Sequence, residues 1–124
     1  MKIKRFEDID SWKAGRELTN IIYSLTSKGS FNKDFGLKDQ IQRASVSIMA
    51  NIAEGFDSNS NKAFINFLNY SFRSASEVQS LLYVAFDQKY INETEFNSVY
   101  IQCNEIKNLI GGFIRYLKNS SNVI

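Results

Sequence analysis

Apolar residues recur at steps of three and four in four segments of the chain, residues 9–28, 37–56, 60–89 and 93–118. This spacing gathers them on one face of an α-helix, which turns once in about 3.6 residues. The last segment follows the pattern most strictly, with Cys103 at one of its apolar positions. None of the segments sustains the alternation by two that a half-buried strand requires. The pattern therefore predicts four amphipathic helices.

Turn-forming residues separate these segments at three places: Lys28 to Gly36, Gly55 to Asn61, and Tyr90 to Asn92. Connections this short favour antiparallel neighbours. We therefore predict an all-α fold, an antiparallel up-down-up-down four-helix bundle, with residues 1–124 forming one domain. The third helix is expected to be the longest, at about 45 Å for a rise of about 1.5 Å per residue. It should extend beyond its shorter neighbours.

The ends of the predicted helices carry start and stop signals. Asn92 followed by Glu95 resembles a capping box, in which each side chain accepts a bond from the other residue's backbone N–H. Either Ser58 or Ser60 is placed to cap the third helix. Gly29 and Gly55 lie where a left-handed residue commonly ends a helix.

Composition argues against most enzyme classes. The 124 residues include no histidine, no proline and one cysteine. Without histidine the chain lacks serine–histidine and cysteine–histidine pairs, the common zinc sites and the usual general base near neutral pH. Glu54 and Glu77 resemble a carboxylate pair, but di-metal bundles typically also use histidine. We therefore expect no catalytic residues, no metal and no cofactor, with Cys103 buried and inert.

The expected location is the cytoplasm. A lone cysteine excludes an internal disulfide and suits a reducing compartment. No apolar run approaches the length of a membrane span, and the N-terminus lacks the apolar stretch of a signal peptide.

The second predicted helix carries a continuous polar row between two apolar rows. We call it the polar row; its members are Gln40, Arg43, Ser47, Asn51 and Glu54. A row in this position needs partners if it is partly buried, and the third helix offers Ser74 and Glu77 on one face. One hypothesis is a hydrogen-bond network that fixes helix register, within or between subunits, formed by Arg43, Ser47, Asn51, Glu54, Ser74 and Glu77. The alternative is an ordinary solvent-facing row.

The third predicted helix has more apolar residues than one core seam requires. Ile65, Phe72 and Phe86 recur at multiples of seven, offset from the core row, with Tyr83 and Tyr90 alongside. Aromatic residues are enriched in subunit contacts, so these five positions are candidates for an oligomer interface. The alternative is scattered surface aromatics beside a wide core stripe.

The sequence resembles the bacterial four-helix-bundle proteins known as ribosomal RNA intervening-sequence or ribosomal-protein-like proteins. The most specific match is GLKDQIQRASVSIMANIAEG over residues 36–55, with its Asn-Ile-Ala-Glu-Gly ending. FEDI at residues 6–9, together with Trp12, Ala14 and Leu18, resembles the family's opening, and SASEV at residues 74–78 and Tyr90-Ile91 resemble later motifs. Family members often carry proline where this chain has Met49, so its second helix is expected to be straighter.

The resemblance implies a ring-shaped homo-oligomer, a pentamer, with a link to RNA. Some members are encoded within insertions in large-subunit ribosomal RNA genes. A related branch is the accessory protein of the reverse transcriptase of diversity-generating retroelements. The resemblance thus favours a non-enzymatic, RNA-associated ring. The alternative is a protein-interaction scaffold that docks a partner such as a reverse transcriptase without binding RNA.

The charge of a single chain gives the RNA hypothesis little support. Its 15 Lys and Arg residues and 13 Asp and Glu residues leave a net charge of only +2. A ring would repeat a weak basic site and gain avidity. The candidates for phosphate contact are Lys2, Lys4, Arg5, Lys13, Arg16 and Lys118. Each is equally open to interpretation as an ordinary solvated side chain.

Overall fold

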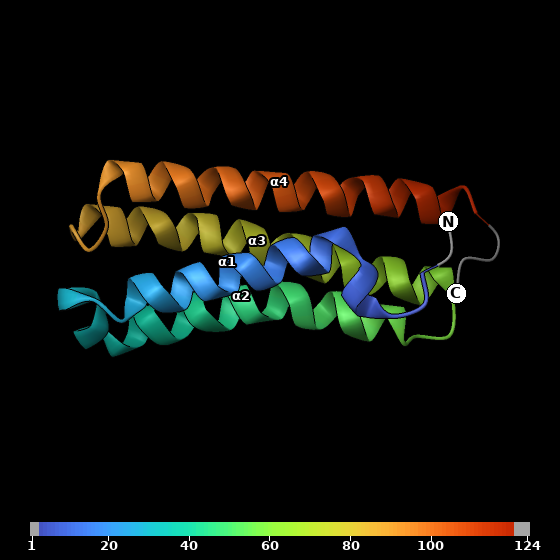
Figure 1. The fold of residues 1–124 in the computed structure, drawn as a ribbon, viewed down its shortest axis with the longest axis horizontal. Coiled ribbons are helices and arrows are strands. Elements are labelled where there is room, and N and C mark those ends of the chain that lie inside the picture. The colour runs from blue at the N-terminus through green and yellow to red at the C-terminus, as the bar shows by residue number, and fades with distance from the viewer. Residues whose placement is uncertain (1–2, 121–124) are drawn as a thin grey trace.

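The computed structural model describes residues 3–120 and shows four long α-helices lying side by side (Figure 1). The predicted all-α, up-down bundle is confirmed, and each predicted helix boundary lies within two residues of the observed one. The helices are α1 (Asp10–Thr26), α2 (Phe35–Phe56), α3 (Asn61–Asp87) and α4 (Glu93–Lys118). Two short 3-10 helices, η1 (Phe6–Asp8) and η2 (Gly29–Lys33), precede α1 and α2.

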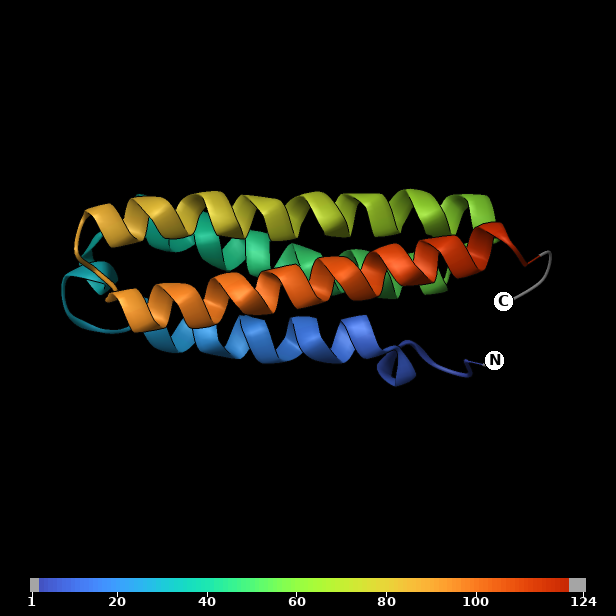
Figure 2. The same ribbon diagram turned by 90° about the horizontal axis from the view of Figure 1, so that it is seen from above.

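The helices pack in chain order around a closed cycle, with contacts between α1 and α2, α2 and α3, α3 and α4, and α4 and α1. The α1–α2 and α3–α4 turns lie at one end of the bundle, which we call the turn end (Figures 1 and 2). Residue 3, the α2–α3 turn and the end of α4 lie at the other, the terminal end. The outer face of α3 and α4 is therefore opposite the outer face of α1 and α2.

All four helices contribute to one hydrophobic core. Leu18, Ile48, Leu82 and Ile110 are among its fully buried side chains, one from each helix. Cys103 is also fully buried, as its apolar position predicts. No helix within residues 3–120 is long and apolar enough to cross a bilayer.

The capping predictions are confirmed where they concern side chains. The Glu95 backbone N–H donates to Asn92 Oδ1 at 2.8 Å, and the Asn92 N–H donates to Glu95 Oε1 at 2.9 Å. Ser60, rather than Ser58, caps α3, accepting from the Ala63 N–H at 3.1 Å. These contacts satisfy backbone donors that have no partner inside the helix.

The two glycines predicted to end helices behave differently. Gly29 takes the predicted positive φ of 52°, but it does not end α1, because α1 ends at Thr26 and Gly29 is the first residue of η2. The prediction for Gly55 is wrong, because Gly55 lies inside α2 and is buried. A Cβ there would lie 2.7 Å from Phe64 Cδ1 and 2.9 Å from Phe67 Cβ. Gly55 thus allows α2 and α3 to approach closely at this point, and a larger residue would hold them apart.

Helix α3 is the longest, but it has 27 residues against 26 in α4. At a rise of about 1.5 Å per residue it measures about 40 Å, so the predicted overhang beyond all its neighbours is wrong with respect to α4. The helix ends earlier than predicted because Lys89 takes a left-handed φ of 64°. The Tyr90 N–H then donates to the Ala85 carbonyl at 2.9 Å, which closes the helix end.

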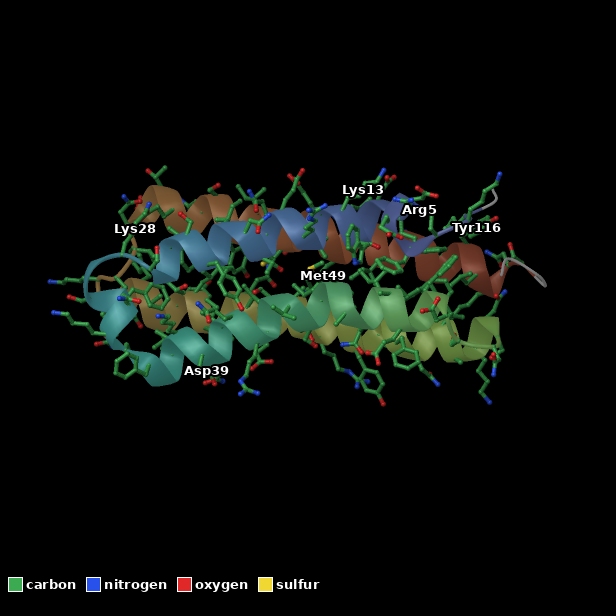
Figure 3. The ribbon with its side chains drawn as sticks, turned by 60° about the horizontal axis from the view of Figure 1, so that its bottom comes forward. Arg5, Lys13, Lys28, Asp39, Met49 and Tyr116 are labelled. Carbon is green, nitrogen blue, oxygen red and sulfur yellow. The ribbon has the colours of Figure 1, made fainter. Side chains whose placement is uncertain are left out.

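Helix α2 runs without interruption through Met49. The side chain is half-buried between α1 and α2, and its sulfur lies 3.7 Å from Thr19 Oγ1 (Figure 3). The single hydrogen of this hydroxyl has its shortest bond to the Gly15 carbonyl, at 2.8 Å, and the oxygen also lies 3.2 Å from the Ser45 carbonyl. In an α-helix that carbonyl also accepts the N–H of residue 49.

Candidate interaction surfaces

The middle of the polar row forms a hydrogen-bonded cluster between α2 and α3. Ser47 Oγ lies 2.9 Å from Ser74 Oγ, and Asn51 Nδ2 donates to both the carbonyl and the hydroxyl of Ser47 at 2.8 and 2.9 Å. Beside them the buried Ser71 hydroxyl donates to the Ile48 carbonyl at 2.7 Å. Small side chains and short bonds thus lock these two helices in one register.

The remaining residues of the hypothesised network lie at the surface. Arg43 is paired with Asp39 on its own helix at 2.8 Å, and its side chain is 80% exposed. Glu77 is exposed and accepts a long bond, 3.4 Å, from Gln40. Glu54 is exposed as well. Within one chain the half-buried network therefore consists of Ser47, Asn51 and Ser74.

A shallow groove runs along the outside of α2 and reaches α1. Arg43, Asn51 and Glu54 line it, together with the exposed side chains of Tyr23 and Val46. Arg43 and Glu54, which we call the outer members of the polar row, thus line a groove between α1 and α2, whereas Ser47 and Asn51 reach this groove and also bond at the α2–α3 seam.

The residues predicted for an oligomer interface separate into two groups. Phe72, Tyr83 and Phe86 are exposed on α3, at 36%, 52% and 39%. Ile65 and Tyr90 are half-buried and pack against the core. Tyr90 stacks on Phe31 at 5.1 Å and donates its hydroxyl to Asp34 Oδ2 at 2.9 Å, which joins the two turns at the turn end. This hydrogen bond raises the pKa of Tyr90.

Aromatic rings from α4 extend the exposed group. Tyr83 lies 4.9 Å from Phe96 and 6.1 Å from Tyr100, measured between ring centroids, and Phe86 lies 5.5 Å from Phe96. These rings and Phe72 form what we call the aromatic face, consisting of Phe72, Tyr83, Phe86, Phe96 and Tyr100. Phe96 is half-buried and lies against Tyr83 and Phe86.

A polar group at the centre of this seam was missed by the sequence analysis. Gln79 is 6% exposed, and its amide donates to the Tyr100 carbonyl and to Asn104 Oδ1 at 3.2 and 2.8 Å. Lys107 donates to Gln79 Oε1 at 3.1 Å and lies 5.0 Å above the Phe72 ring. A single glutamine between apolar positions gives no signal in the sequence that it is buried.

The basic residues predicted to contact phosphate lie toward the terminal end. Arg5 is held by Glu7 and Asp8 at 3.7 and 3.8 Å. Arg16 lies 5.9 Å above the Trp12 ring, and Figure 3 shows Arg5 and Lys13 near each other along the start of α1. Lys4, Lys13 and Lys118 are exposed, and Lys2 lies outside the described residues. Four carboxylates, those of Glu7, Asp8, Asp10 and Glu17, accompany these cations between residues 3 and 17.

A cavity of about 230 Å³ lies between the start of α1 and the end of α4. Leu109, Phe113 and Tyr116 form its α4 wall, and Ser11 lies on the opposite side. The Ser11 hydroxyl is buried and has no hydrogen-bond partner among residues 3–120. The cavity is thus largely apolar and lies between the N-terminal segment and α4.

Groups with reactive potential are few in the part of the chain that the structure describes. Burial raises the pKa of the Cys103 thiol to about 12, which keeps it protonated near neutral pH. Nowhere within residues 3–120 do three or more His, Cys, Asp or Glu side chains gather closely enough to hold a metal ion.

Comparison with known proteins assigns the chain to a family. The family model for the 23S rRNA-intervening sequence protein matches residues 7–112. A solved structure of a protein with unknown function from the S23 ribosomal protein family of Bacteroides thetaiotaomicron has a TM-score of 0.77 and 28% sequence identity. The similarity covers 85% of this chain and 98% of that one. No curated protein matches the sequence. With the match extending over most of its length, the chain belongs to the 23S rRNA-intervening sequence protein family.

Proposed function

We propose that this protein is a non-enzymatic, self-associating helical bundle that binds RNA. The observation that carries the proposal is the family match over residues 7–112, since the family is named for a sequence within 23S ribosomal RNA. The lack of histidine and the protonated Cys103 favour a binding role over catalysis.

Self-association is supported by the exposure of the aromatic face. Phe72, Tyr83 and Phe86 are each more than one-third exposed and lie along one side of α3. Rings of this kind are enriched in subunit contacts. A cyclic ring of more than two copies requires two different faces in contact. The groove on the opposite, α1–α2 face, with Tyr23, Val46 and the outer members of the polar row, provides the second face.

Assembly would also change the electrostatics. One chain has a net charge of +2, but a pentamer repeats each basic site five times around a ring. Linked weak sites bind with an avidity that exceeds the affinity of each one. Lys13 and Lys118 are exposed and, unlike Arg5, lie within 4 Å of no carboxylate among the described residues, so they are suitable candidate cations to test.

The experiment measures mass and RNA binding on the same preparation. Light scattering gives the mass of the native protein, and fluorescence anisotropy with a labelled RNA gives its affinity over a series of salt concentrations. We expect an oligomer and an affinity whose logarithm falls by about 0.7 per phosphate contact for each tenfold rise in salt, as counterion release requires for single strands. Lys13→Ala with Lys118→Ala should reduce that slope. A monomer contradicts self-association.

A scaffold that docks another protein is the second candidate function, favoured by the same aromatic face. An intact oligomer that binds no RNA at low salt would contradict the RNA proposal and leave the scaffold as the better explanation. Binding that does not respond to salt would also contradict it, because phosphate contacts are ionic.

A further inference from the structure

The α1–α2 turn presents an exposed aromatic ring among lysines. Phe35, the first residue of α2, is 75% exposed, more than any other large hydrophobic side chain in the described residues. Lys28, Lys33 and Lys38 lie in the same turn. We propose that this turn, residues 28–38, binds single-stranded RNA: Phe35 stacks on a base and the lysines contact the flanking phosphates. The proposal rests on the RNA association proposed above and locates a contact for it at the turn end.

The backbone of the turn is held firmly enough to present the ring. Phe31 is 2% exposed and stacks on Tyr90 from the neighbouring turn. Asp34 accepts the Tyr90 hydroxyl with one oxygen and caps α2 with the other, through the Leu37 N–H at 3.2 Å. Of the two phenylalanines, one anchors the turn and the other projects from it. Because the backbone beneath Phe35 is already fixed, binding at this ring requires little further ordering of the turn.

The charge of the turn suits a polyanion. Three lysines stand against a single carboxylate, and that carboxylate, Asp34, is turned inward by the bonds just described. Within the described residues no carboxylate oxygen lies within 4 Å of any of the three amino groups. The Lys38 amino group instead donates to Asn32 Oδ1 at 2.6 Å. These charges are therefore available to phosphates, in contrast to Arg5 at the terminal end.

The space beside Phe35 admits a flat ring. A shallow groove there is lined by Phe35, Gly36, Lys38, Asp39 and Gln42. A Cβ at Gly36 would meet only Asp34 Oδ1, at 4.0 Å, so one side of the groove is open backbone. Asp39 is paired with Arg43 at 2.8 Å, which offsets part of its repulsion of an anion. Bases of a single strand expose the faces that stack on such a ring, whereas bases of a duplex do not.

An anionic membrane surface is the other polyanion that lysines and phenylalanine attract. Interfacial segments bind lipid through a broad apolar face. In residues 28–38 the other large apolar side chains, Phe31 and Leu37, are buried in the core. A single exposed ring is enough for one stacked base and too little for a membrane-bound face.

The test compares Phe35→Ala with Tyr70→Ala, a matched loss of an exposed ring on α3. The probes are a fluorescently labelled single-stranded RNA of about 12 nucleotides and a duplex RNA of the same length. Phe35→Ala should weaken single-strand binding by about fivefold to tenfold, the lower part of the range for one stacked base, and leave duplex binding unchanged. Tyr70→Ala should change neither. Both melting temperatures should stay close to that of the native protein, since both rings are exposed.

A second variant, Lys28→Ala with Lys33→Ala, tests the phosphate contacts. It should weaken binding to both probes and lower the salt slope for the single strand by about 1.4, or about 0.7 per contact. Lys62→Ala, an exposed lysine on α3, is the control.

The outcomes separate the two proposals. If the native protein binds RNA and Phe35→Ala binds it as tightly as Tyr70→Ala does, the turn site is overturned and RNA association stands. Native protein that binds neither probe at about 50 mM salt overturns both. If Phe35→Ala instead abolishes binding to vesicles of phosphatidylcholine and phosphatidylserine while RNA binding is unchanged, the turn contacts lipid and the RNA site is wrong.

Discussion

Helix α3 makes two very different seams with its neighbours. Toward α2 it packs through small residues, at Gly55 and through the Ser47–Ser74 hydrogen bond. Toward α4 it packs through rings, with Tyr83 lying on Phe96. The α2–α3 seam leaves little space between the two backbones, whereas the α3–α4 seam leaves large side chains partly exposed to solvent.

The difference shows how one helix combines folding with recognition. Short bonds between small side chains fix the register of α2 and α3, because a sliding helix would lose them all. Rings at the α3–α4 seam bury area with less directional demand and leave apolar surface over for a partner. We therefore expect substitutions at the first seam to change stability and substitutions at the second to change assembly.

The largest effect is expected for Gly55→Ala. Replacing a helical glycine with alanine usually stabilises a protein by about 0.5–1 kcal/mol, because glycine is freer in the unfolded chain. Here the new Cβ would meet Phe64 and Phe67 at less than 3 Å, so we expect destabilisation by about 1–3 kcal/mol from overpacking. The measurement is the free energy of unfolding in urea.

Gly111→Ala provides the matched control in α4. A Cβ there would meet only Arg115 Nη1, at 3.6 Å, so the ordinary gain of about 0.5–1 kcal/mol should appear. If Gly55→Ala were stabilised as much as Gly111→Ala, the close approach of α2 and α3 would not exist in solution.

The next effect is expected for Ser47→Ala, at about 1 kcal/mol of destabilisation. The change leaves the half-buried hydroxyl of Ser74 and the amide of Asn51 without one partner each. Ser80→Ala, at an exposed position of α3, should lie within about 0.5 kcal/mol of the native protein.

A double-mutant cycle with Ser74→Ala isolates the hydrogen bond itself. We expect the two substitutions together to cost less than their sum by about 0.5–1 kcal/mol, because either one already breaks the bond. Strict additivity would show that the two hydroxyls do not interact.

Much of this seam could be predicted from sequence, because helix periodicity and caps are local. Spacing alone brought Ser47, Asn51 and Ser74 together, and Asn92 with Glu95 specified the start of α4. The predicted network also included Arg43, Glu54 and Glu77, which lie at the surface. A step of three residues turns a helix back by about 60° from the starting direction, and Arg43 and Glu54 each follow such a step. They therefore leave the seam while Gln40, Ser47 and Asn51 stay near it.

Other features depend on contacts that no local pattern contains. A glycine near a helix end looks the same whether it ends the helix or admits a neighbour, and only Phe64 and Phe67 decide this for Gly55. Likewise the lysines around Phe35 resemble any solvated turn. The available signal was Phe35 itself, an apolar residue in a polar turn outside the apolar row of α2.

A smaller effect, this time a gain in stability, is expected at the turn that joins α3 and α4. Lys89 adopts φ 64°, a conformation that costs a non-glycine residue about 1 kcal/mol or more. Lys89→Gly should relieve that cost and raise the melting temperature by a few degrees. Gln88→Gly, at a neighbouring residue with φ −82°, should lower it. A fall in melting temperature for both variants would contradict the left-handed turn.

The smallest change in stability is expected for Tyr83→Ser, although its effect on assembly should be large. Tyr83 is 52% exposed, and its ring meets Phe96 and Tyr100 edge-on. The free energy of unfolding should therefore fall by only about 0.5 kcal/mol. If the face joins subunits, the native melting temperature rises with protein concentration, because association stabilises the folded chain. In Tyr83→Ser that dependence should disappear and light scattering should give the mass of one chain. Tyr70→Ser, equally exposed on α3, should retain both; an oligomer of unchanged mass in Tyr83→Ser would place the contact on another face.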